Sequence, residues 1–466
     1  MFGKLKHIHF IGIGGAGMSG IALVLKNMGF EVTGSDLKPT DLTKNLAQSG
    51  IKVIYGHHPD NCRGADVVVY SSAIKPDNVE LVQAQRSKIP VIPRAEMLAE
   101  LMRMKTAIAV AGSHGKTTVT SMISQILERA NLDPTTVIGG RILGQPTGAK
   151  LGKSQYLVAE ADESDRSFLL LYPTIAVITN IEREHLDCYK DLDRIKRAFV
   201  KFANKVPFFG TVVLGIDSKA VREICPKIKR PKVSYGRQGK AMFKAIDIQL
   251  KPFGSEFTLT ALGETIDRFT INIPGLFNVE NSLAAIAVAR SIDIDYPTIK
   301  ESLFNFSGVH RRLERIGEKS GVIFYDDYAH HPTEIQVTLN TLRNAFPKQR
   351  IITIFQPHRY TRTKFLAQDF GSCFGDCDIL LITEIYPAGE PAIPGVSAQL
   401  IVSAIKAHNS SHPQVIYIKD KNKISDYLLS SGLKSGDVVI TLGAGNIWEI
   451  GKELYSKIDP PKADQP

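Results

Sequence analysis

The 466-residue chain is predicted to be an α/β protein with three domains. The predicted order is an N-terminal Rossmann-like domain, a central P-loop ATPase-like parallel sheet with an antiparallel flank, and a C-terminal Rossmann-like α/β domain. Three observations predict this class. The length exceeds what one hydrophobic core supports. Strand-like apolar runs alternate with helical patterns along the chain. Two glycine-rich turns each lie between a strand-like apolar run and a helical pattern.

The N-terminal domain is expected over residues 1–105, where strands and helices alternate. Its strand-like segments are 7–12, 31–36, 65–71 and 91–92, and its helical patterns cover 17–28 and the stretch that ends at Met102. This alternation is typical of a doubly wound parallel sheet.

The central domain is expected over residues 106–308. Segments 106–110, 156–160 and 175–179 are continuous apolar runs, which are typical of strands covered on both faces. Polar and apolar residues alternate between about 233 and 273, which predicts the antiparallel flank, and a helix is expected over 279–290.

The C-terminal domain is expected over residues 309–466 and has a third α/β pattern. Its predicted strands are 321–325, 350–354, 378–382, 415–418 and 437–441, with helical segments between them. No internal repeat and no low-complexity linker separates the three domains.

Composition excludes several classes of protein. The net charge of +10 comes without a run of five like charges, aromatic–basic interleaving or zinc-finger spacing, so anionic nucleotides are better-supported partners than nucleic acid. The start of the chain has no signal-peptide pattern, and no apolar stretch reaches the length of a membrane span. The five cysteines form neither a disulfide framework nor a metal-type pair. We therefore expect a cytoplasmic protein with no membrane partner, whose thiols are reduced.

The most specific motif is Ala-Gly-Ser-His-Gly-Lys-Thr-Thr at residues 111–118, between a strand-like run and a helical pattern. Such a turn points backbone N–H groups and a helix N-terminus at a phosphate. Lys116 can neutralise phosphate charge, and the Thr117 hydroxyl can bind Mg²⁺. The glycine spacing is shorter than in the usual P-loop.

A second glycine turn, Gly12-x-Gly14-x-x-Gly17, opens the chain, and Asp36 follows at the end of the next predicted strand. Taken alone, this pattern indicates a nicotinamide dinucleotide site. Its physics requires only a diphosphate near a helix N-terminus and leaves the attached nucleoside open.

Acidic residues follow two strands of the central domain. Glu160 ends one apolar run, and His185 lies among three acids after the next run. The carboxyl ends of parallel strands meet at one edge of a sheet, where ligands bind. Oxygen and imidazole groups at that edge, beside a phosphate loop, indicate a metal site.

The ordered motifs resemble those of the Mur ligase family over nearly the whole chain. In the N-terminal half they are residues 12–20 (Gly-Ile-Gly-Gly-Ala-Gly-Met-Ser-Gly), 112–118, 160–165 (Glu-Ala-Asp-Glu-Ser-Asp) and 179–187 (Thr-Asn-Ile-Glu-Arg-Glu-His-Leu-Asp). Further along they are residues 274–281 (Pro-Gly-Leu-Phe-Asn-Val-Glu-Asn), 310–312 (His-Arg-Arg), 326–334 (Asp-Asp-Tyr-Ala-His-His-Pro-Thr-Glu) and 357–362 (Pro-His-Arg-Tyr-Thr-Arg).

The resemblance implies an ATP-dependent ligase that joins L-alanine to the lactyl carboxylate of UDP-N-acetylmuramate through an acyl phosphate, for peptidoglycan synthesis. The implied cofactors are ATP and Mg²⁺, and the enzyme would be a monomer or homodimer. The N-terminal domain would bind the UDP-sugar, the central domain would bind ATP, and the C-terminal domain would bind the amino acid and close over ATP.

The resemblance also implies roles for individual residues. Substrate contacts would come from Gly14, Gly15, Ala16, Gly17, Met18, Ser19, Asp36, Ser71 and Tyr328. ATP contacts would come from Gly112, Ser113, His114, Gly115, Lys116, Thr117, Thr118, Asn278, Asn281, Arg312 and Asp327. Metal ligands would be Thr117, Glu160 and His185, and catalytic residues would be Lys116, His330, Arg359 and Arg362. Tyr328, His330, Arg359 and Arg362 would receive L-alanine and the lactyl carboxylate.

Three alternatives remain open from the sequence. A related ligase could attach a peptide, rather than free alanine, to the same UDP-sugar. A nicotinamide-dependent oxidoreductase would use the first glycine turn but would leave the loop at 112–118 without a purpose. A non-catalytic regulator would bind ATP and release no phosphate.

Overall fold

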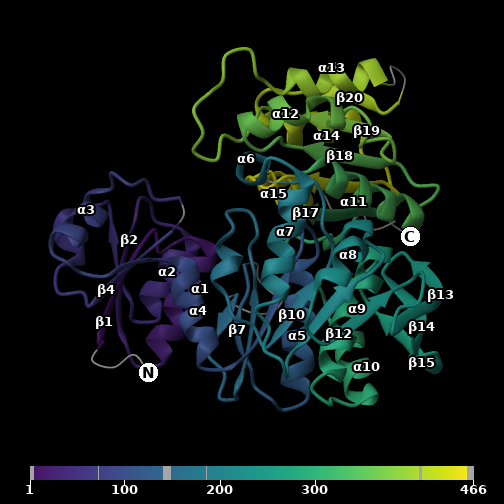
Figure 1. Ribbon diagram of the computed structural model, residues 1–466. Coiled ribbons are helices and arrows are strands. Elements are labelled where there is room, and N and C mark those ends of the chain that lie inside the picture. The colour runs from purple at the N-terminus through teal and green to yellow at the C-terminus, as the bar shows by residue number, and fades with distance from the viewer. Residues whose placement is uncertain (1–4, 72, 140–147, 185, 409–411, 459–466) are drawn as a thin grey trace, which may run out of the picture. The chain divides into compact units, whose positions relative to one another are not determined.

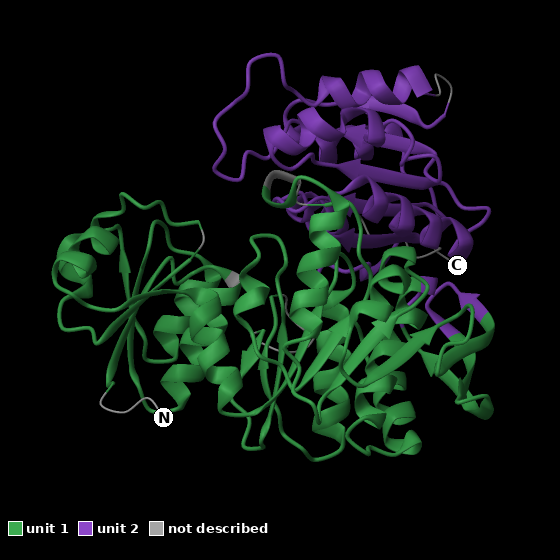
Figure 2. Cartoon of the chain, viewed as in Figure 1, with its two compact units in different colours: residues 1–248, 256–272, 277–309 green, residues 249–255, 273–276, 310–466 purple. Residues whose placement is uncertain are grey.

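The computed structural model describes residues 5–71, 73–139, 148–184, 186–408 and 412–458, which form three sheets with their helices (Figure 1). Two compact units divide the chain (Figure 2). Unit 1 contains residues 1–248, 256–272 and 277–309, and unit 2 contains 249–255, 273–276 and 310–466. Unit 1 holds the first two sheets and unit 2 holds the third. The predicted three-domain α/β class is confirmed, and the domain boundaries at 105/106 and 308/309 stay predictions.

The first sheet has the strand order β3-β2-β1-β4-β5, and all its strands are parallel. Its elements are β1 His7–Ile11, α1 Ala16–Asn27, β2 Glu31–Asp36, α2 Asp41–Gln48, β3 Lys52–Tyr55, η1 Pro59–Cys62, β4 Val67–Tyr70, α3 Val79–Arg86, β5 Val91–Pro93 and α4 Arg94–Arg103. The strand order reverses between β1 and β4, which is where open α/β sheets bind ligands. The first glycine turn follows β1 and therefore lies at this switch point.

The second sheet has ten strands in the order β15-β14-β13-β12-β11-β10-β6-β9-β7-β8. Its strands are β6 Thr106–Ala111, β7 Thr135–Val137, β8 Ala149–Lys150, β9 Tyr156–Glu160, β10 Ile175–Ile178, β11 Thr211–Gly215, β12 Lys232–Gly236, β13 Phe243–Lys251, β14 Gly254–Ala261 and β15 Glu264–Ile271. Its helices are α5 Lys116–Arg129, η2 Ser167–Leu170, α6 Leu186–Tyr189, α7 Leu192–Ala203, α8 Lys219–Ile224, η3 Cys225–Lys227, α9 Leu276–Arg290 and α10 Tyr296–Phe304. The central strands are buried on both faces, as their continuous apolar runs predict.

The flank of this sheet differs in detail from the prediction. Strand β13 still pairs in parallel with β12, so the alternating segment does not begin as an antiparallel strand. Two-residue turns then join β13 to β14 and β14 to β15. Such short turns connect only antiparallel neighbours. Leu262 and Gly263 in the second turn both have positive φ, as a type I′ hairpin requires.

The third sheet has the order β16-β17-β21-β18-β19-β20. Its strands are β16 Glu314–Lys319, β17 Val322–Asp327, β18 Ile351–Phe355, β19 Ile379–Ile382, β20 Gln414–Tyr417 and β21 Val438–Leu442. Its helices are α11 Pro332–Ala345, α12 Tyr360–Phe370, α13 Gln399–His408, η4 Lys421–Lys423, α14 Ile424–Ser431 and α15 Trp448–Lys457. Strand β16, absent from the prediction, is an antiparallel edge, and the other pairings are parallel.

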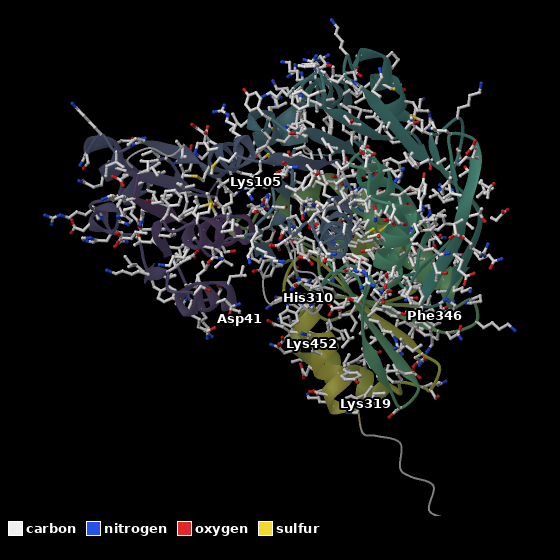
Figure 3. The ribbon with its side chains drawn as sticks, turned by 90° about the horizontal axis from the view of Figure 1, so that it is seen from below. Asp41, Lys105, His310, Lys319, Phe346 and Lys452 are labelled. Atoms are coloured by element: carbon white, nitrogen blue, oxygen red, sulfur yellow. The ribbon has the colours of Figure 1, made fainter. Side chains whose placement is uncertain are left out.

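Unit 2 also includes the turn between β13 and β14. Phe253 in that turn packs edge to face on Phe346, with ring centroids 6.1 Å apart, and Arg315 lies over the Phe253 ring. Phe346 is labelled in Figure 3.

All five cysteines are free thiols, as predicted. Cys373 and Cys377 are both buried in the connection between α12 and β19. No helix in the described part of the chain is long and apolar enough to span a membrane.

Candidate active site

The phosphate loop connects β6 to α5 at the carboxyl edge of the second sheet. Gly112 has φ +141° and Gly115 has φ +83°, and both values lie in the region that favours glycine. A Cβ at Gly112 would collide with the Thr179 hydroxyl, and one at Gly115 would lie 2.5 Å from Asn281 Oδ1. Helix α5 begins at Lys116, so its first N–H groups face the loop. The local geometry is that of an anion-binding turn.

Lys116 folds back over this loop. Its Nζ donates to the Gly112 carbonyl at 2.6 Å and to Glu163 Oε1 at 2.9 Å. Burial acts to lower the pKa of Lys116, but Glu163 and Asp162 outweigh it and raise the pKa above its usual value. The ammonium group is therefore fixed in its charged form at the position where a phosphate would approach.

The two residues that follow strand β10 hold the other side of the loop. The Thr179 hydroxyl donates to the His114 carbonyl at 2.6 Å, and Asn180 Oδ1 accepts the His114 N–H at 2.8 Å. The imidazole of His114 lies 3.2 Å from Glu182 Oε2 and 3.6 Å from Glu184 Oε1. These contacts hold the phosphate loop in place from the end of β10, the strand next to β6 in the sheet.

Helix α9 approaches the same loop with two buried amides. Asn281 lies against Gly115, and its Nδ2 donates to Asn278 Oδ1 at 3.2 Å. Asn281 is therefore beside the phosphate loop itself. The prediction that Asn278 and Asn281 face adenine stays a prediction.

The predicted metal ligands lie only partly within the described residues. Thr117 is buried in the first turn of α5, and Glu160 at the end of β9 accepts the Gly139 N–H at 2.9 Å. His185 lies outside the described residues. Where the chain is described, no cluster of three or more His, Cys, Asp or Glu could hold a metal ion by itself. A hydroxyl and a carboxylate beside a phosphate loop nevertheless fit Mg²⁺, which keeps water and phosphate oxygens as its other ligands.

The first glycine turn is fixed by the end of β2. Asp36 Oδ2 accepts the Gly14 N–H at 2.8 Å, and a Cβ at Gly14 would lie 2.8 Å from the same oxygen. Gly17 faces Arg94, whose Nη1 would be 2.9 Å from an added Cβ. Ser71, after β4, lies beside Gly12. The structure thus brings Asp36 and Ser71 to the predicted turn, and it also places the guanidinium of Arg94 there.

Four predicted substrate residues, 16–19, form the first turn of helix α1. Met18 N and Ser19 N donate to the Gly15 carbonyl, both at 2.9 Å. The start of α1 is therefore well formed at the switch point of the first sheet.

In unit 2, two adjacent acids end β17. Asp326 accepts from Thr441 Oγ1 at 2.6 Å and from Arg311 Nε at 3.0 Å. Asp327 is buried and accepts the Leu313 N–H at 2.8 Å. Burial raises the pKa of Asp327 to about 6.

The segment after β17 carries the predicted substrate residues. The His330 imidazole Nδ1 lies 3.0 Å from the Tyr328 carbonyl, and the His330 N–H donates to Glu334 Oε2 at 3.0 Å. The guanidinium of Arg312 lies over the Tyr328 ring, 5.4 Å from its centroid. Burial lowers the pKa of His330 to about 4, so the ring is neutral near pH 7.

The segment after β18 lies against the same part of unit 2. The ring of His358 has its centroid 5.7 Å from that of His330 and stacks on Tyr386. Arg362 Nη1 donates to His358 Nδ1 at 3.0 Å. Arg359, at the start of α12, has φ +72°, a strained value for a non-glycine residue. Burial lowers the pKa of His358 to about 3.

The site residues predicted from the sequence leave out several members of these clusters. Among them are Glu163, which holds Lys116, Glu334, which holds the His330 backbone, and Gln356, which follows β18. The Gln356 Oε1 is buried and has no hydrogen-bond partner among the described residues. Glu163 and Glu334 lie inside motifs that were recognised, and Gln356 lies one residue before one.

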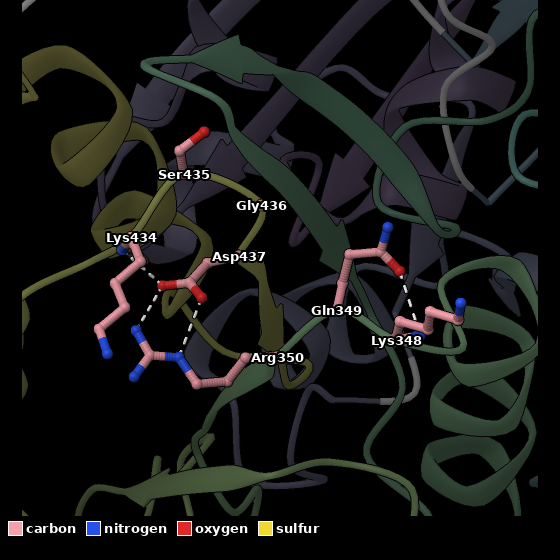
Figure 4. Close-up of a pocket in the computed structure, with 7 residues that line it drawn as sticks. All are labelled: Lys348, Gln349, Arg350, Lys434, Ser435, Gly436 and Asp437. Carbon is pink, nitrogen blue, oxygen red and sulfur yellow. Dashed lines mark hydrogen bonds and ion pairs between the residues drawn. The ribbon is translucent and has the colours of Figure 1, made fainter.

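A pocket of about 290 Å³ lies at the opposite, amino-terminal edge of the third sheet (Figure 4). It lies between the residues that precede β18 and those that precede β21. Its Arg350 forms a double ion pair with Asp437, with distances of 2.9 Å and 2.5 Å. The predicted residues of unit 2 lie at the other edge of this sheet, so this pocket is not part of the candidate site.

Three family models match the chain, each over one of the sheets. Their descriptions are "Mur ligase family, catalytic domain" for residues 7–106, "Mur ligase middle domain" for 110–289 and "Mur ligase, glutamate ligase domain" for 311–445. The chain belongs to the Mur ligase family. The resemblance inferred from the motifs is confirmed.

Curated relatives of this Mur ligase match it from end to end. A UDP-N-acetylmuramate–L-alanine ligase from a Geobacter species is 49% identical over 462 residues, 99% of this chain and 100% of the relative. One from Geotalea uraniireducens is 50% identical over 98% of this chain and 99% of the relative.

Solved structures of other Mur ligases have the same fold. UDP-N-acetylmuramate–alanine ligase MurC from Thermotoga maritima is 27% identical, covers 97% of this chain and 99% of its own, and gives a TM-score of 0.83. A murein peptide ligase from Psychrobacter arcticus is 24% identical over the same shares, with a TM-score of 0.72, and shows the fold alone.

Proposed function

We propose that this Mur ligase joins L-alanine to the lactyl carboxylate of UDP-N-acetylmuramate and consumes ATP. The products are UDP-N-acetylmuramoyl-L-alanine, ADP and phosphate. The relatives named for this activity support the choice of substrates, because they are 48–50% identical over at least 97% of the chain. Lys116, held in its charged form over the phosphate loop, is the observation that carries the ATP-dependent part. We place the reaction in the cytoplasm, where ATP and nucleotide sugars are available.

The carboxylate must be activated before an amine can attack it. The lactyl carboxylate oxygen attacks the γ-phosphorus of ATP, and the bond to the ADP oxygen breaks, which leaves an acyl phosphate. Lys116 and the N–H groups at the start of α5 offset the negative charge on the transferred phosphoryl group. Glu163 positions the Lys116 ammonium group through their 2.9 Å contact.

We propose that Thr117 and Glu160 hold the Mg²⁺ that accompanies ATP. The ion supplies charge neutralisation on the phosphate oxygens. The predicted third ligand, His185, lies outside the described residues.

The neutral amine of L-alanine then attacks the acyl carbon, the bond from that carbon to the phosphate oxygen breaks, and the proton that the amine loses leaves with the phosphate. Because the Tyr328 carbonyl can only accept, His330 Nδ1 carries the proton and Nε2 keeps its lone pair. With a pKa of about 4, His330 is a weak base, and we assign it to orienting the amine. Arg359 and Arg362 supply positive charge for the carboxylates and the developing oxyanion.

Phosphate release in the presence of both substrates, ATP and Mg²⁺ tests the proposal. We expect Lys116→Ala to lower release by about a thousandfold or more, whereas Lys153→Ala, which removes an exposed lysine of the same domain, should leave it unchanged.

Loss of Lys116 also removes the cation beside buried Glu163, so misfolding must be separated from loss of chemistry. The double variant Lys116→Met/Glu163→Gln removes both charges and should fold while remaining inactive. Near-normal turnover in a folded Lys116 variant would contradict the phosphate-loop assignment.

The choice of acceptor needs its own assay. L-Alanine should support phosphate release, and short peptides should not. A preference for a peptide would replace the proposed function with that of a murein peptide ligase.

A further inference from the structure

Two adjacent phenylalanines protrude from the amino-terminal edge of the second sheet. Strands β6, β10, β11 and β12 are parallel, so the phosphate loop lies at one end of these strands and the segments that enter them lie at the other. Phe208 and Phe209, in the connection from α7 to β11, are 82% and 69% exposed. Their rings meet edge to face, with centroids 5.3 Å apart. They form an apolar tip away from the phosphate loop.

Three exposed lysines lie beside this tip, in the segment that enters β12. The Val212 N–H at the start of β11 donates to the Pro231 carbonyl at 2.8 Å, which brings the two segments together. Lys227, Lys229 and Lys232 are exposed there.

Asn204, after α7, ties this lysine segment to the connection that carries the phenylalanines. Its Oδ1 accepts the Lys229 N–H at 2.8 Å, and its Nδ2 donates to the Lys227 carbonyl at 3.2 Å. The lysines and the aromatic tip are thus parts of one surface, although they are distant in the sequence.

An aromatic residue from a third segment adds to this surface. Tyr172, before β10, is 48% exposed, and Lys205 Nζ lies 4.3 Å from its ring centroid. The Thr211 N–H donates to the Thr174 carbonyl at 3.1 Å, so this segment borders the one with the phenylalanines.

The positive charge of this surface is not neutralised locally. Residues 199–210 and 225–236 contain no aspartate or glutamate. None of Lys227, Lys229 and Lys232 forms an ion pair with any carboxylate that the structure describes. The Lys232 ammonium donates to the Ile228 carbonyl at 2.9 Å, which leaves its charge without a carboxylate partner. The surface therefore combines exposed aromatic rings with positive charge that no described carboxylate neutralises.

We propose that this basic–aromatic edge, formed by Tyr172, Phe208, Phe209, Lys227, Lys229 and Lys232, binds the surface of an anionic phospholipid bilayer. The phenylalanines enter the boundary between headgroups and acyl chains, and the lysines bind the lipid phosphates. Lysine is depleted in protein–protein interfaces, so its predominance here favours headgroups over a protein partner. The contact is peripheral and needs no membrane span, but it departs from the expectation of no membrane partner. It leaves the other end of the strands, with the phosphate loop, away from the lipid.

Co-sedimentation of the full chain with vesicles tests this proposal. We expect the protein to pellet with vesicles of phosphatidylglycerol and phosphatidylcholine in equal parts, but not with phosphatidylcholine alone. The variant Phe208→Ser/Phe209→Ser should reduce pelleting by about tenfold or more. Each of Lys227→Gln, Lys229→Gln and Lys232→Gln should reduce it roughly fivefold at low salt.

The chain offers a matched aromatic control. Phe365 in unit 2 is 76% exposed and also has a lysine near its ring, so Phe365→Ser tests whether any exposed phenylalanine suffices. It should pellet like the unmodified protein. The double phenylalanine variant should keep its ligase activity in solution, which verifies its fold.

A second readout reports insertion directly. Phe209→Trp should show a blue shift of tryptophan emission with the anionic vesicles only. Equal pelleting of the double variant, or no pelleting with either vesicle, would overturn the proposal. If the same residues instead retain the protein on a poly-glutamate matrix while vesicles do not, the edge is a docking surface for an acidic protein and the lipid proposal is wrong.

Discussion

The buried carboxylate of Glu80 joins separate segments of the first domain, and we predict that its loss weakens UDP-sugar binding. Glu80 is fully buried on α3. Its Oε2 accepts from Ser35 Oγ at 2.9 Å and lies 2.9 Å from His9 Nε2. Its Oε1 lies 2.8 Å from His57 Nδ1 and accepts from Asn61 Nδ2 at 3.0 Å. One side chain therefore connects β1, β2 and the loop after β3.

The link to function passes through Ser35. Its hydroxyl donates to Glu80, and its carbonyl accepts the N–H groups of Gly12 at 2.9 Å and Ile13 at 3.0 Å. The part of β2 that Glu80 anchors is thus the part that holds the first glycine turn. Loosening it should raise the KM for the UDP-sugar more than it lowers kcat.

The size of the effect follows from the four contacts. Hydrogen bonds to a charged group contribute about 1.5–3 kcal/mol each, but loss of one partner of a buried cluster typically costs about 3–5 kcal/mol in total because the rest relaxes. We expect that cost for Glu80→Ala. Glu80→Gln keeps the shape and exchanges one oxygen for an NH₂ group, so it should cost about 1–3 kcal/mol.

The pH dependence has a definite sign. Burial acts to raise the pKa of Glu80, but His9, Asn61 and His57 outweigh it and lower the pKa below its ordinary value of 4.5. The carboxylate therefore stabilises the fold above about pH 4.5, and this contribution is lost as the pH falls through the lower folded value. Glu80→Gln should remove this dependence.

Amide hydrogen exchange of peptides from β1 and β2 measures the loss of stability where it occurs. Tryptophan fluorescence does not, because the only tryptophan, Trp448, lies in unit 2. Glu31→Ala, which removes an exposed carboxylate from the other end of β2, is the matched control. Unchanged exchange and an unchanged KM in Glu80→Ala would refute the reasoning.

Two further predictions concern the other clusters. Gly112→Ala should abolish phosphate release and lower the melting temperature, because its Cβ would collide with Thr179. The control Gly56→Ala, at a glycine with φ +92° and no atom within 4 Å of an added Cβ, should lower the free energy of unfolding by only about 1–2 kcal/mol. Equal effects of the two variants would contradict the predicted steric role. His330, with a pKa of about 4 against an ordinary 6.5, should give no inflection near pH 6.5 in kcat/KM, and an inflection there that disappears in His330→Gln would show that its imidazole titrates normally.

Much of the fold could be predicted because its buried parallel strands are continuous apolar runs. Strand β9 was placed to the residue, and β10 to within one residue. Strand β16 could not be found, since Glu-Arg-Ile-Gly-Glu-Lys is a polar edge strand with a register shift between Arg315 and Gly317. Its pairing with β17 depends on tertiary context, which no local pattern reports.

The candidate site was predictable where chemistry is concentrated in a motif, as at the phosphate loop. Its supporting contacts were not, because they join residues far apart in the sequence. Lys116 and Glu163 are 47 positions apart, and Asn180 and His114 are 66 apart. Gln356 gave no signal at all, because a single amide before a motif looks like any loop residue. The basic–aromatic edge could not be predicted from the sequence either, because its phenylalanines and lysines lie in separate segments.

Asn281 shows what the structure adds to a motif residue. The sequence resemblance assigned it to adenine, and that role stays a prediction. Its Oδ1 lies where a Cβ on Gly115 would be 2.5 Å away. Gly115 therefore satisfies two demands at once, a left-handed φ of +83° and space for a buried amide. The amide packs against the second glycine of the loop from helix α9, so a side chain larger than the hydrogen of glycine would displace either the loop or Asn281.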